Sequence, residues 1–193
     1  MADLITLREY KDMEGIQNPK DDYNPSQLIS SVSQLVKTYC GNTFIDYYST
    51  DKVDTFSIDW DTHLVQLTES PVISVSAVET RDSVTSSYQA VTSTNYYLDY
   101  NTDTVLYVTG SNYKNWPRGP GAVKVTYRAG YSSLPGDLKL AVIDLITYYY
   151  RDEYKERKTL AGATVQNPGT SSQDSSVAFP DHIKRVLDLY KNF

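Results

Sequence analysis

The chain has 193 residues, including 18 tyrosines, 4 phenylalanines and 2 tryptophans, and its 18 basic and 24 acidic residues give a net charge of −6 at pH 7. A chain of this length can form one domain with a core that buries roughly 70% of the unfolded surface. The acidic balance argues against a protein that mainly neutralises phosphates, so neither tight nucleic-acid binding nor docking to an anionic membrane is expected.

The sequence offers no internal disulfide, targeting segment or membrane span. Cys40 is the single cysteine, and synthesis in a reducing compartment is therefore expected. The first residues, Met1 to Thr6, lack the basic and apolar regions of a signal peptide, and no later stretch approaches about 18 apolar residues. We expect a soluble protein that is made in the cytosol.

A first helix is predicted over residues 6–14. Thr6 can cap its start, and Glu9 follows three residues later, which is the spacing of a capping box. Gly15 is a typical stop signal, because glycine readily adopts the left-handed conformation that ends a helix.

A second helix is predicted over residues 25–40. Asn24 precedes Pro25, which is favourable at a first helical position, and apolar side chains then recur at helical spacing. Gly41 is expected to close this helix in the left-handed conformation.

Between residues 44 and 131 the apolar pattern changes to a period of two, as at Phe56, Ile58 and Trp60. This pattern is typical of half-buried strands. The segment Asn101-Thr102-Asp103 separates two such runs and predicts a hairpin turn. No helix-length crossover separates the strands, so an antiparallel sheet is expected.

The strongest helical pattern begins at Pro135 and predicts a helix over residues 135–158, with strongly charged last turns. Residues 160–179 are rich in serine, threonine and glycine, which is typical of a flexible linker. Residues 180–193 then predict a final amphipathic helix whose apolar face is expected to dock on a partner. That face consists of Ile183, Val186, Leu187 and Tyr190.

Together these elements predict an α+β protein. A small helical body of about four helices would carry an inserted antiparallel β-rich region and a tethered C-terminal helix. Residues 1–159 are expected to form a single domain, with residues 160–179 as the linker and residues 180–193 as the docking helix.

The sequence shows no catalytic constellation. His63 and His182 lie in different segments without other ligands at metal spacing, so surface roles are expected. Residues 59–62 superficially resemble an Asp-x-Asp phosphatase nucleophile, but no buried apolar strand precedes them. Residues 118–121 match neither phosphate-binding glycine motif and predict a tight turn. Cys40 is expected to act as a small hydrophobe, and we expect no enzymatic activity, cofactor or metal.

Tyrosines occur in adjacent groups, at residues 47–48, 96–97 and 148–150. Neighbouring rings point to opposite faces of a strand or around a helix, so they cannot all enter one core. Tyrosine is enriched at protein interfaces, which favours extensive contact with other proteins. Two alternatives are a tyrosine-rich but ordinary core and surface, and a small β-rich carbohydrate-binding or adhesion module in which Trp60 or Trp116 stacks on sugars.

Several segments resemble, in their order along the chain, segments of one known family. They are Leu4-Ile5-Thr6-Leu7, Tyr39-Cys40-Gly41-Asn42-Thr43-Phe44, the strand from Leu67 to Val75, the run from Trp116 to Tyr131, and Leu134-Pro135-Gly136-Asp137-Leu138-Lys139. This order is similar to that of the tailed-bacteriophage head-to-tail connector family, also called neck adaptor or head-completion proteins. Phe179-Pro180 and the last helix also resemble the closing arm of that family.

The resemblance implies a non-enzymatic virion protein, made in the host cytoplasm, that forms a ring beneath the portal. The ring is expected to be a dodecamer that joins the portal protein to the next neck or tail-completion protein. DNA would pass through its central channel without specific binding, and no membrane would be involved. The docking face of the last helix would then meet the portal or another partner. Contacts between subunits are expected at Tyr148, Tyr150, Tyr154 and Trp116.

Two features depart from the compact members of that family. The β-rich region is longer, and the linker before the last helix is extended. The resemblance therefore leaves open which surface of the protein meets which partner.

Overall fold

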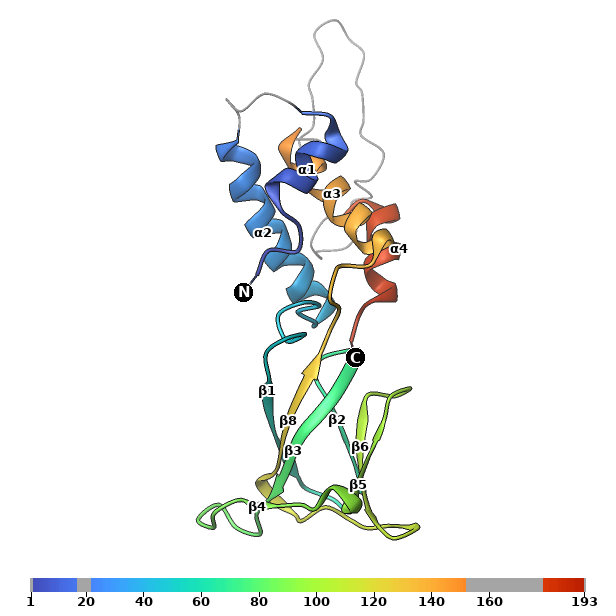
Figure 1. The fold of residues 1–193 in the computed structure, drawn as a ribbon. Helices are drawn as coiled ribbons and strands as arrows, with labels where there is room; N and C mark the ends of the chain where they lie inside the picture. Colours follow the sequence, from blue (N-terminus) through green and yellow to red (C-terminus); the bar gives the residue numbers. More distant parts are fainter. Residues whose placement is uncertain (1, 17–21, 152–178, 193) are drawn as a thin grey trace, which may run out of the picture. The chain divides into compact units, whose positions relative to one another are not determined.

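The computed structural model describes residues 2–16, 22–151 and 179–192, which fall into two compact units (Figure 1). The helical unit consists of residues 1–40, 134–191 and 193, and the β unit consists of residues 41–133 with Asn192. The predicted α+β class is confirmed, and the β-rich region expected at 44–131 lies within a unit of its own. No helix among the described residues is long and apolar enough to span a membrane.

The first helix, α1, is determined by its local capping chemistry. It spans Leu7–Glu14, and the Thr6 hydroxyl before it accepts a hydrogen bond from the Glu9 N–H at 3.2 Å. The Glu9 carboxylate in turn accepts from the Thr6 N–H at 2.8 Å, which completes the capping box. Gly15 ends the helix with a φ of 67°. The predicted cap and the predicted stop are both confirmed.

Three further helices form the core of the helical unit. They are α2 (Tyr23–Cys40), α3 (Gly136–Tyr150) and α4 (Asp181–Leu189). α3 packs on α2, and α4 packs on both of them. Burial of the apolar stripes where these helices meet provides the main stabilisation. Their most deeply buried side chains are Val36, Cys40, Leu138, Val142, Leu145, Ile146, Ile183 and Leu187.

The helix boundaries differ from the predictions in detail. α2 begins at Tyr23, two residues before the predicted start, because Pro25 fits within the first turn, where its missing N–H costs nothing. α4 ends at Leu189, before the predicted end at residue 193. The predicted continuation of the third helix from residue 152 to 158 lies outside the described residues, as does the linker apart from Phe179.

The capping residue Glu9 also ties α1 to α3, which predicts a dependence of stability on pH. Its carboxylate lies 2.5 Å from the Lys139 ammonium, and this contact, with the Thr6 N–H, lowers the pKa of Glu9 to about 2. Because the pKa of Glu9 in the folded protein lies below its ordinary value of 4.5, the contribution to stability is complete above pH 4.5 and disappears as the pH falls toward 2. Both partners are more than one-third exposed, so we expect about 1 kcal/mol or less.

The measurement is denaturation of the wild type and of Glu9→Gln at pH 7 and at pH 3. We expect the wild type to be more stable at pH 7 and the difference to shrink at pH 3. Asp12→Asn is the control, since that carboxylate lies 3.7 Å from Arg8 in an exposed pair on the same helix. A Glu9→Gln difference that is as large at pH 3 as at pH 7 would contradict the assignment.

The β unit contains two antiparallel sheets where one was expected. In spatial order, the first sheet consists of β1 (Lys52–Ile58), β8 (Gly119–Ala129), β3 (Val72–Thr80) and β4 (Gln89–Ala90). The second consists of β2 (Leu64–Gln66), β6 (Thr104–Thr109) and β5 (Tyr96–Asp99), with β7 (Asn112–Tyr113) paired to β6. Each described pair of strands is antiparallel, as predicted.

The predicted hairpin at residues 101–103 joins β5 to β6 and is confirmed. Asp103 has a φ of 50°, a conformation that aspartate tolerates in turns. Its carboxylate accepts from the Val72 N–H at 2.8 Å and from the Ser70 hydroxyl at 2.6 Å. The turn residue therefore also fixes the position at which the chain enters β3.

Both sheets contribute side chains to one hydrophobic core. In β8, Val123, Val125 and Tyr127 are buried, while the alternating residues point to the opposite face. Trp116 is also part of this core, and its ring stacks on that of Tyr107 with centroids 4.4 Å apart. The core is therefore built by the period-two pattern that the sequence shows.

Two local predictions for the β unit are wrong. Tyr47 and Tyr48 do not lie on a strand but in turns before β1, where the Tyr48 N–H is 3.4 Å from the Ile45 carbonyl oxygen. The glycine-rich residues from Gly119 to Gly121 do not form a separate tight turn but begin β8, where Gly119 pairs with Ile58. At Gly119 the pairing with a distant strand decides the conformation, whereas Tyr48 is held by a local turn.

Candidate assembly surfaces

The apolar face of α4, which was predicted to dock on a partner, is covered by helices of the same chain. Ile183 and Leu187 are only 1% and 0% exposed, and α4 packs on both α2 and α3. Val186 and Tyr190 are half-buried. The expectation that Ile183 and Leu187 await an external surface is corrected, because the helical unit itself removes this stripe from water.

Polar contacts surround the buried side of α4. The Tyr190 hydroxyl donates to both carboxylate oxygens of Asp137, at 2.7 and 2.9 Å, which holds the pKa of that carboxyl below its usual value. The Tyr39 hydroxyl donates to Asp188 at 2.6 Å, and this hydrogen bond raises the pKa of Tyr39 to about 12. These bonds fix the position of α4 along α2 and α3 within the helical unit.

Cys40 lies beneath α4. Its thiol is fully buried, with Sγ 3.6 Å from the carbonyl oxygen of Leu187. Burial raises the pKa of Cys40 to about 12, so the reactive thiolate is scarce at neutral pH. The prediction that this cysteine acts as a small hydrophobe is confirmed, and its reactivity will report whether α4 is in place.

One apolar side chain of α4 does point to solvent. Leu189 is 79% exposed. Sequence reasoning missed it because it lies outside the helical stripe that defines the buried face. The signal that the sequence offered was an apolar residue, Leu189, outside the predicted apolar stripe of the last helix.

Of the residues predicted to make subunit contacts, Trp116 lies in the β unit, and Tyr148 and Tyr150 lie on α3 in the helical unit. Trp116 is 2% exposed within the β unit, so its assignment as an outer contact is corrected. Its ring is needed to fill the core against Tyr107. Tyr150 is partly exposed at the end of α3, and Tyr148 is half-buried. Tyr154 lies outside the described residues.

An exposed apolar surface that the sequence did not indicate lies on the second sheet. The strand register places Leu64, Leu106 and Tyr97 directly opposite one another on β2, β6 and β5. The alternating residues Val65 and Val105 are buried in the core, so the row of three lies on the opposite face. Tyr97 is 59% exposed, and Leu64 is also exposed.

The same surface continues along β6 onto β7. Val108 lies two residues after Leu106 and therefore on the same face, and it pairs with the exposed Tyr113. The Tyr113 ring also contacts the His63 ring, with centroids 4.4 Å apart. We refer to Leu64, Tyr97, Leu106, Val108 and Tyr113 as the apolar face of the second sheet.

The outer face of the first sheet has a different character. Lys124 on β8 pairs with Glu79 on β3 at 2.5 Å, and Arg128 on β8 pairs with Asp51 at 2.7 Å. Opposite charges across strands suit a face that stays in water. The outer face of the first sheet therefore carries ion pairs beside the exposed Val53, whereas the outer face of the second sheet carries a row of apolar and aromatic side chains.

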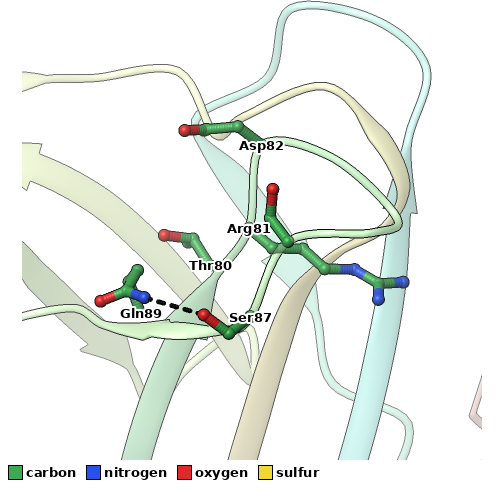
Figure 2. A pocket seen from close by; sticks show the side chains of 6 residues that line it. Thr80, Arg81, Asp82, Ser87 and Gln89 are labelled. Atoms are coloured by element: carbon green, nitrogen blue, oxygen red, sulfur yellow. Dashed lines mark hydrogen bonds between the residues drawn. The ribbon is translucent and has the colours of Figure 1, made fainter.

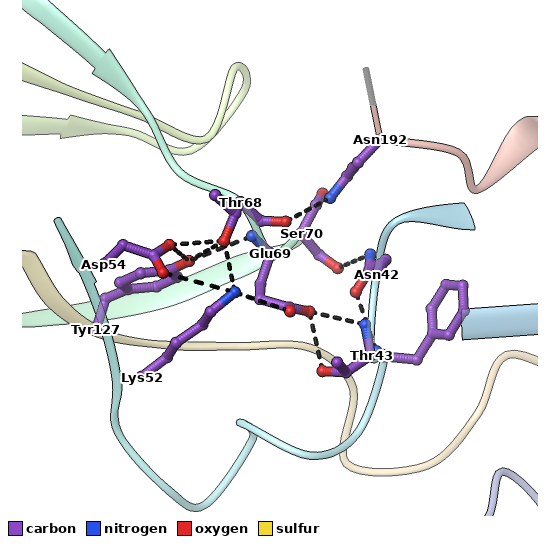
Figure 3. Close-up of polar contacts among 10 residues, drawn as sticks. Asn42, Thr43, Lys52, Asp54, Thr68, Glu69, Ser70, Tyr127 and Asn192 are labelled. Atoms are coloured by element: carbon purple, nitrogen blue, oxygen red, sulfur yellow. Dashed lines mark hydrogen bonds and ion pairs between the residues drawn. The ribbon is translucent and has the colours of Figure 1, made fainter. Parts of the chain in front are cut away.

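A polar network lies inside the β unit (Figure 3). The Lys52 ammonium is 3.0 Å from the Glu69 carboxylate and 3.7 Å from that of Asp54, and it donates to the Thr68 hydroxyl at 2.5 Å. The Tyr127 hydroxyl donates to Asp54 at 2.6 Å. Burial raises the pKa of Tyr127, and this hydrogen bond raises it further. Buried charges are tolerable only when paired in this way.

The network also holds the segment that follows α2. The Glu69 carboxylate accepts from the N–H and the hydroxyl of Thr43, at 2.8 and 2.9 Å. The Asn42 amide donates to the Ser70 carbonyl at 2.6 Å, and the Asn192 amide donates to that of Thr68 at 3.2 Å (Figure 3). The network's polar groups are used to brace the β unit, which argues for a structural role.

A shallow hollow of about 420 Å³ lies beside the turn between β3 and β4 (Figure 2). Arg81 lines it, but its Nε, Nη1 and Nη2 donate to the carbonyls of Gly121, Val84 and Pro120, at 3.0 to 3.1 Å. These bonds hold the guanidinium group against the backbone of the surrounding loops. The other lining residues are Thr80, Asp82, Ser86, Ser87 and Gln89.

Among the described residues, no group of three or more histidine, cysteine, aspartate or glutamate side chains could hold a metal ion. The two histidines are far apart in the sequence, with His63 against Tyr113 and His182 exposed on α4. The exposed apolar and aromatic side chains of the described surfaces are of the kind found in contacts between proteins.

Comparison with known proteins agrees with this character. A family model described as head completion protein matches residues 3–193. The chain is 24% identical over 189 residues to the head completion protein of Escherichia phage T5. The aligned region covers 97% of this chain and 98% of that protein.

Solved structures share the fold. A chain from the neck of an empty gene transfer agent particle, computed with C6 symmetry, has a TM-score of 0.63 at 15% identity and covers 98% of this chain and 90% of that chain. A chain from the neck of a native particle, computed with C12 symmetry, has a TM-score of 0.59 at 14% identity, with coverages of 100% and 94%.

Proposed function

Because this chain belongs to the head completion protein family, we propose that it is a structural virion protein that connects a DNA-filled phage head to its neck or tail. The observation that carries this proposal is the length of the family match, which includes both units and α4. The fold shared with chains of gene transfer agent necks supports the same position in the particle.

In this proposal, copies of the chain form a ring below the portal protein, and the next neck or tail-completion protein binds on the other side. A dodecamer is favoured, since one neck of similar fold was computed with C12 symmetry. DNA passes through the central channel. The net charge of −6 suits a channel in which DNA slides without specific binding, because strong attraction to phosphates would hold it.

We further propose that the solvent-facing side of α4 contacts the portal. Ile183 and Leu187 are occupied inside the helical unit, so the available positions are Leu189 with the half-buried Val186 and Tyr190. Tyr148, Tyr150 and Tyr154 stay candidates for contacts between subunits. Exposed leucine and tyrosine side chains gain free energy when a partner removes them from water.

The test is electron microscopy of the purified protein, alone and mixed with the cognate portal protein. We expect rings or decorated portals, and we expect Leu189→Asp to weaken portal binding at least about tenfold, because a carboxylate would have to be desolvated. Tyr23→Asp is the matched control, since Tyr23 is an equally exposed apolar position of the helical unit. A protein that stays monomeric and never binds the portal protein would contradict the proposal.

The carbohydrate-binding alternative is weakened by the structure. It required Trp60 or Trp116 to stack on sugars, and Trp116 is buried in the core of the β unit. Trp60 is exposed in the loop after β1. A single exposed aromatic side chain does not by itself mark a binding site, so Trp60 alone does not favour this function.

A further inference from the structure

The apolar face of the second sheet has three exposed side chains, Leu64, Tyr97 and Tyr113, that the proposed function does not yet use. We infer that this face is a lateral contact surface for a second copy of the chain, an inference that rests on the proposed ring. The argument depends on its continuity, its lack of charge, its size and its contrast with the other sheet.

The surface is continuous because strand pairing places its members side by side. Leu64, Leu106 and Tyr97 form one cross-strand row, and Val108 with Tyr113 continues it along β6 and β7. Cross-strand neighbours of this kind have Cβ atoms about 5 Å apart, so a partner would meet one apolar area. Each of the five side chains is uncharged.

The first sheet provides an internal comparison. Its outer face has the same architecture but carries the ion pairs of Lys124 with Glu79 and of Arg128 with Asp51. Water stabilises such a face well. The second sheet presents leucine, valine and tyrosine in the equivalent place, which is typical of a surface that is covered in an assembly.

The surroundings of the apolar face argue against DNA as its partner. At one end the row is followed by Gln66, Thr104 and Asp99, which pair across β2, β6 and β5. Asp99 would repel phosphates, and a site for DNA needs lysine or arginine. A protein surface is therefore the better match.

The size of the apolar face fits a contact that is repeated between copies in a ring. Each tyrosine can bury about 150–250 Å², so the whole face presents on the order of 400 Å². A stable pair of proteins usually buries about 800 Å² on each partner. This face is too small to hold an isolated dimer, but in a closed ring each copy is held on two sides, so a contact of this size can contribute.

Cross-linking of assembled protein tests this inference. The Tyr97→Cys variant is labelled with a thiol-reactive benzophenone. Val53→Cys, labelled in the same way, is the matched control. Val53 is 57% exposed on the outer face of the first sheet, and Tyr97 is 59% exposed on that of the second. The native Cys40 is fully buried and stays unlabelled. The labelled protein is mixed with its unlabelled, isotopically heavy form and the portal protein, and then irradiated.

We expect the probe at position 97 to link light to heavy copies at least about tenfold more than the probe at position 53. Tyr97→Asp should reduce ring formation on the portal at least about tenfold, with little effect from Val53→Asp. Links from position 97 only to portal, to another neck protein or within one copy would overturn the inference, as would equal yields at both positions. Those results would leave the proposed function standing, whereas a protein that never joins the portal overturns both.

Discussion

Leu187→Asp should unfold the helical unit, with a loss of more than about 4 kcal/mol. Leu187 is fully buried where α4 packs on α2 and α3. Removing a buried leucine side chain costs about 2–5 kcal/mol, and burying a carboxylate in its place adds several kcal/mol. The total stability of a domain is usually only about 5–15 kcal/mol. Chemical denaturation followed by circular dichroism measures the loss.

Leu189→Asp is the matched control, because it makes the same change two residues away at a side chain that is 79% exposed. We expect it to change stability by less than about 0.5 kcal/mol. The labelling rate of the Cys40 thiol gives a second reading, since the thiol lies against the Leu187 carbonyl. Leu187→Asp should expose it, and Leu189→Asp should not.

The opposite outcome has a clear meaning. If Leu187→Asp kept the wild-type stability and the protection of Cys40, α4 would not be part of the core of the helical unit. Its apolar face would then be free to bind a partner, as the sequence suggested. The experiment therefore decides between two roles for the same helix.

Gly130→Ala should destabilise the β unit by at least about 3 kcal/mol. Gly130 has a φ of 100°, and a Cβ there would lie 2.2 Å from the carbonyl oxygen of Phe44. That oxygen already accepts from the Tyr131 N–H at 2.6 Å, so it cannot move without breaking this bond. The backbone conformation alone costs a residue with a Cβ about 1–3 kcal/mol, and the clash with backbone atoms adds to it.

Gly136→Ala is the control for this prediction. Nothing lies within 4 Å of a Cβ at Gly136, which is the first residue of α3. Alanine there should be neutral or stabilising by up to about 1 kcal/mol, because it reduces the freedom of the unfolded chain. Fluorescence of the buried Trp116 reports unfolding of the β unit. Equal stability of both variants would show that the approach of Phe44 to Gly130 is not required.

Local signals predicted much of the fold. The capping box of Thr6 and Glu9 and the stop at Gly15 are present as expected. The antiparallel pairing and the hairpin at residues 101–103 are also confirmed. Each of these depends on the chemistry of a few neighbouring residues, which the sequence displays directly.

The candidate surfaces were harder to predict. The helical spacing of Ile183 and Leu187 correctly indicated an apolar stripe. Spacing alone does not show whether the surface that buries the stripe belongs to the same chain. Trp116 could have lain on the surface or in the core, and its stacking on Tyr107 shows that it fills the core. Leu64 and Tyr97 are far apart in sequence and meet only through their shared neighbour Leu106 on β6.

The sequence was enough to establish the class of protein, its helices, its antiparallel strands and a family resemblance that runs along the chain. Caps, turns and periodic burial are short-range effects, so they can be read residue by residue. Which apolar side chains stay exposed depends on long-range packing. The covering of α4 by α2 and α3, and the register that joins Leu64, Leu106 and Tyr97, exist only once distant segments are brought together.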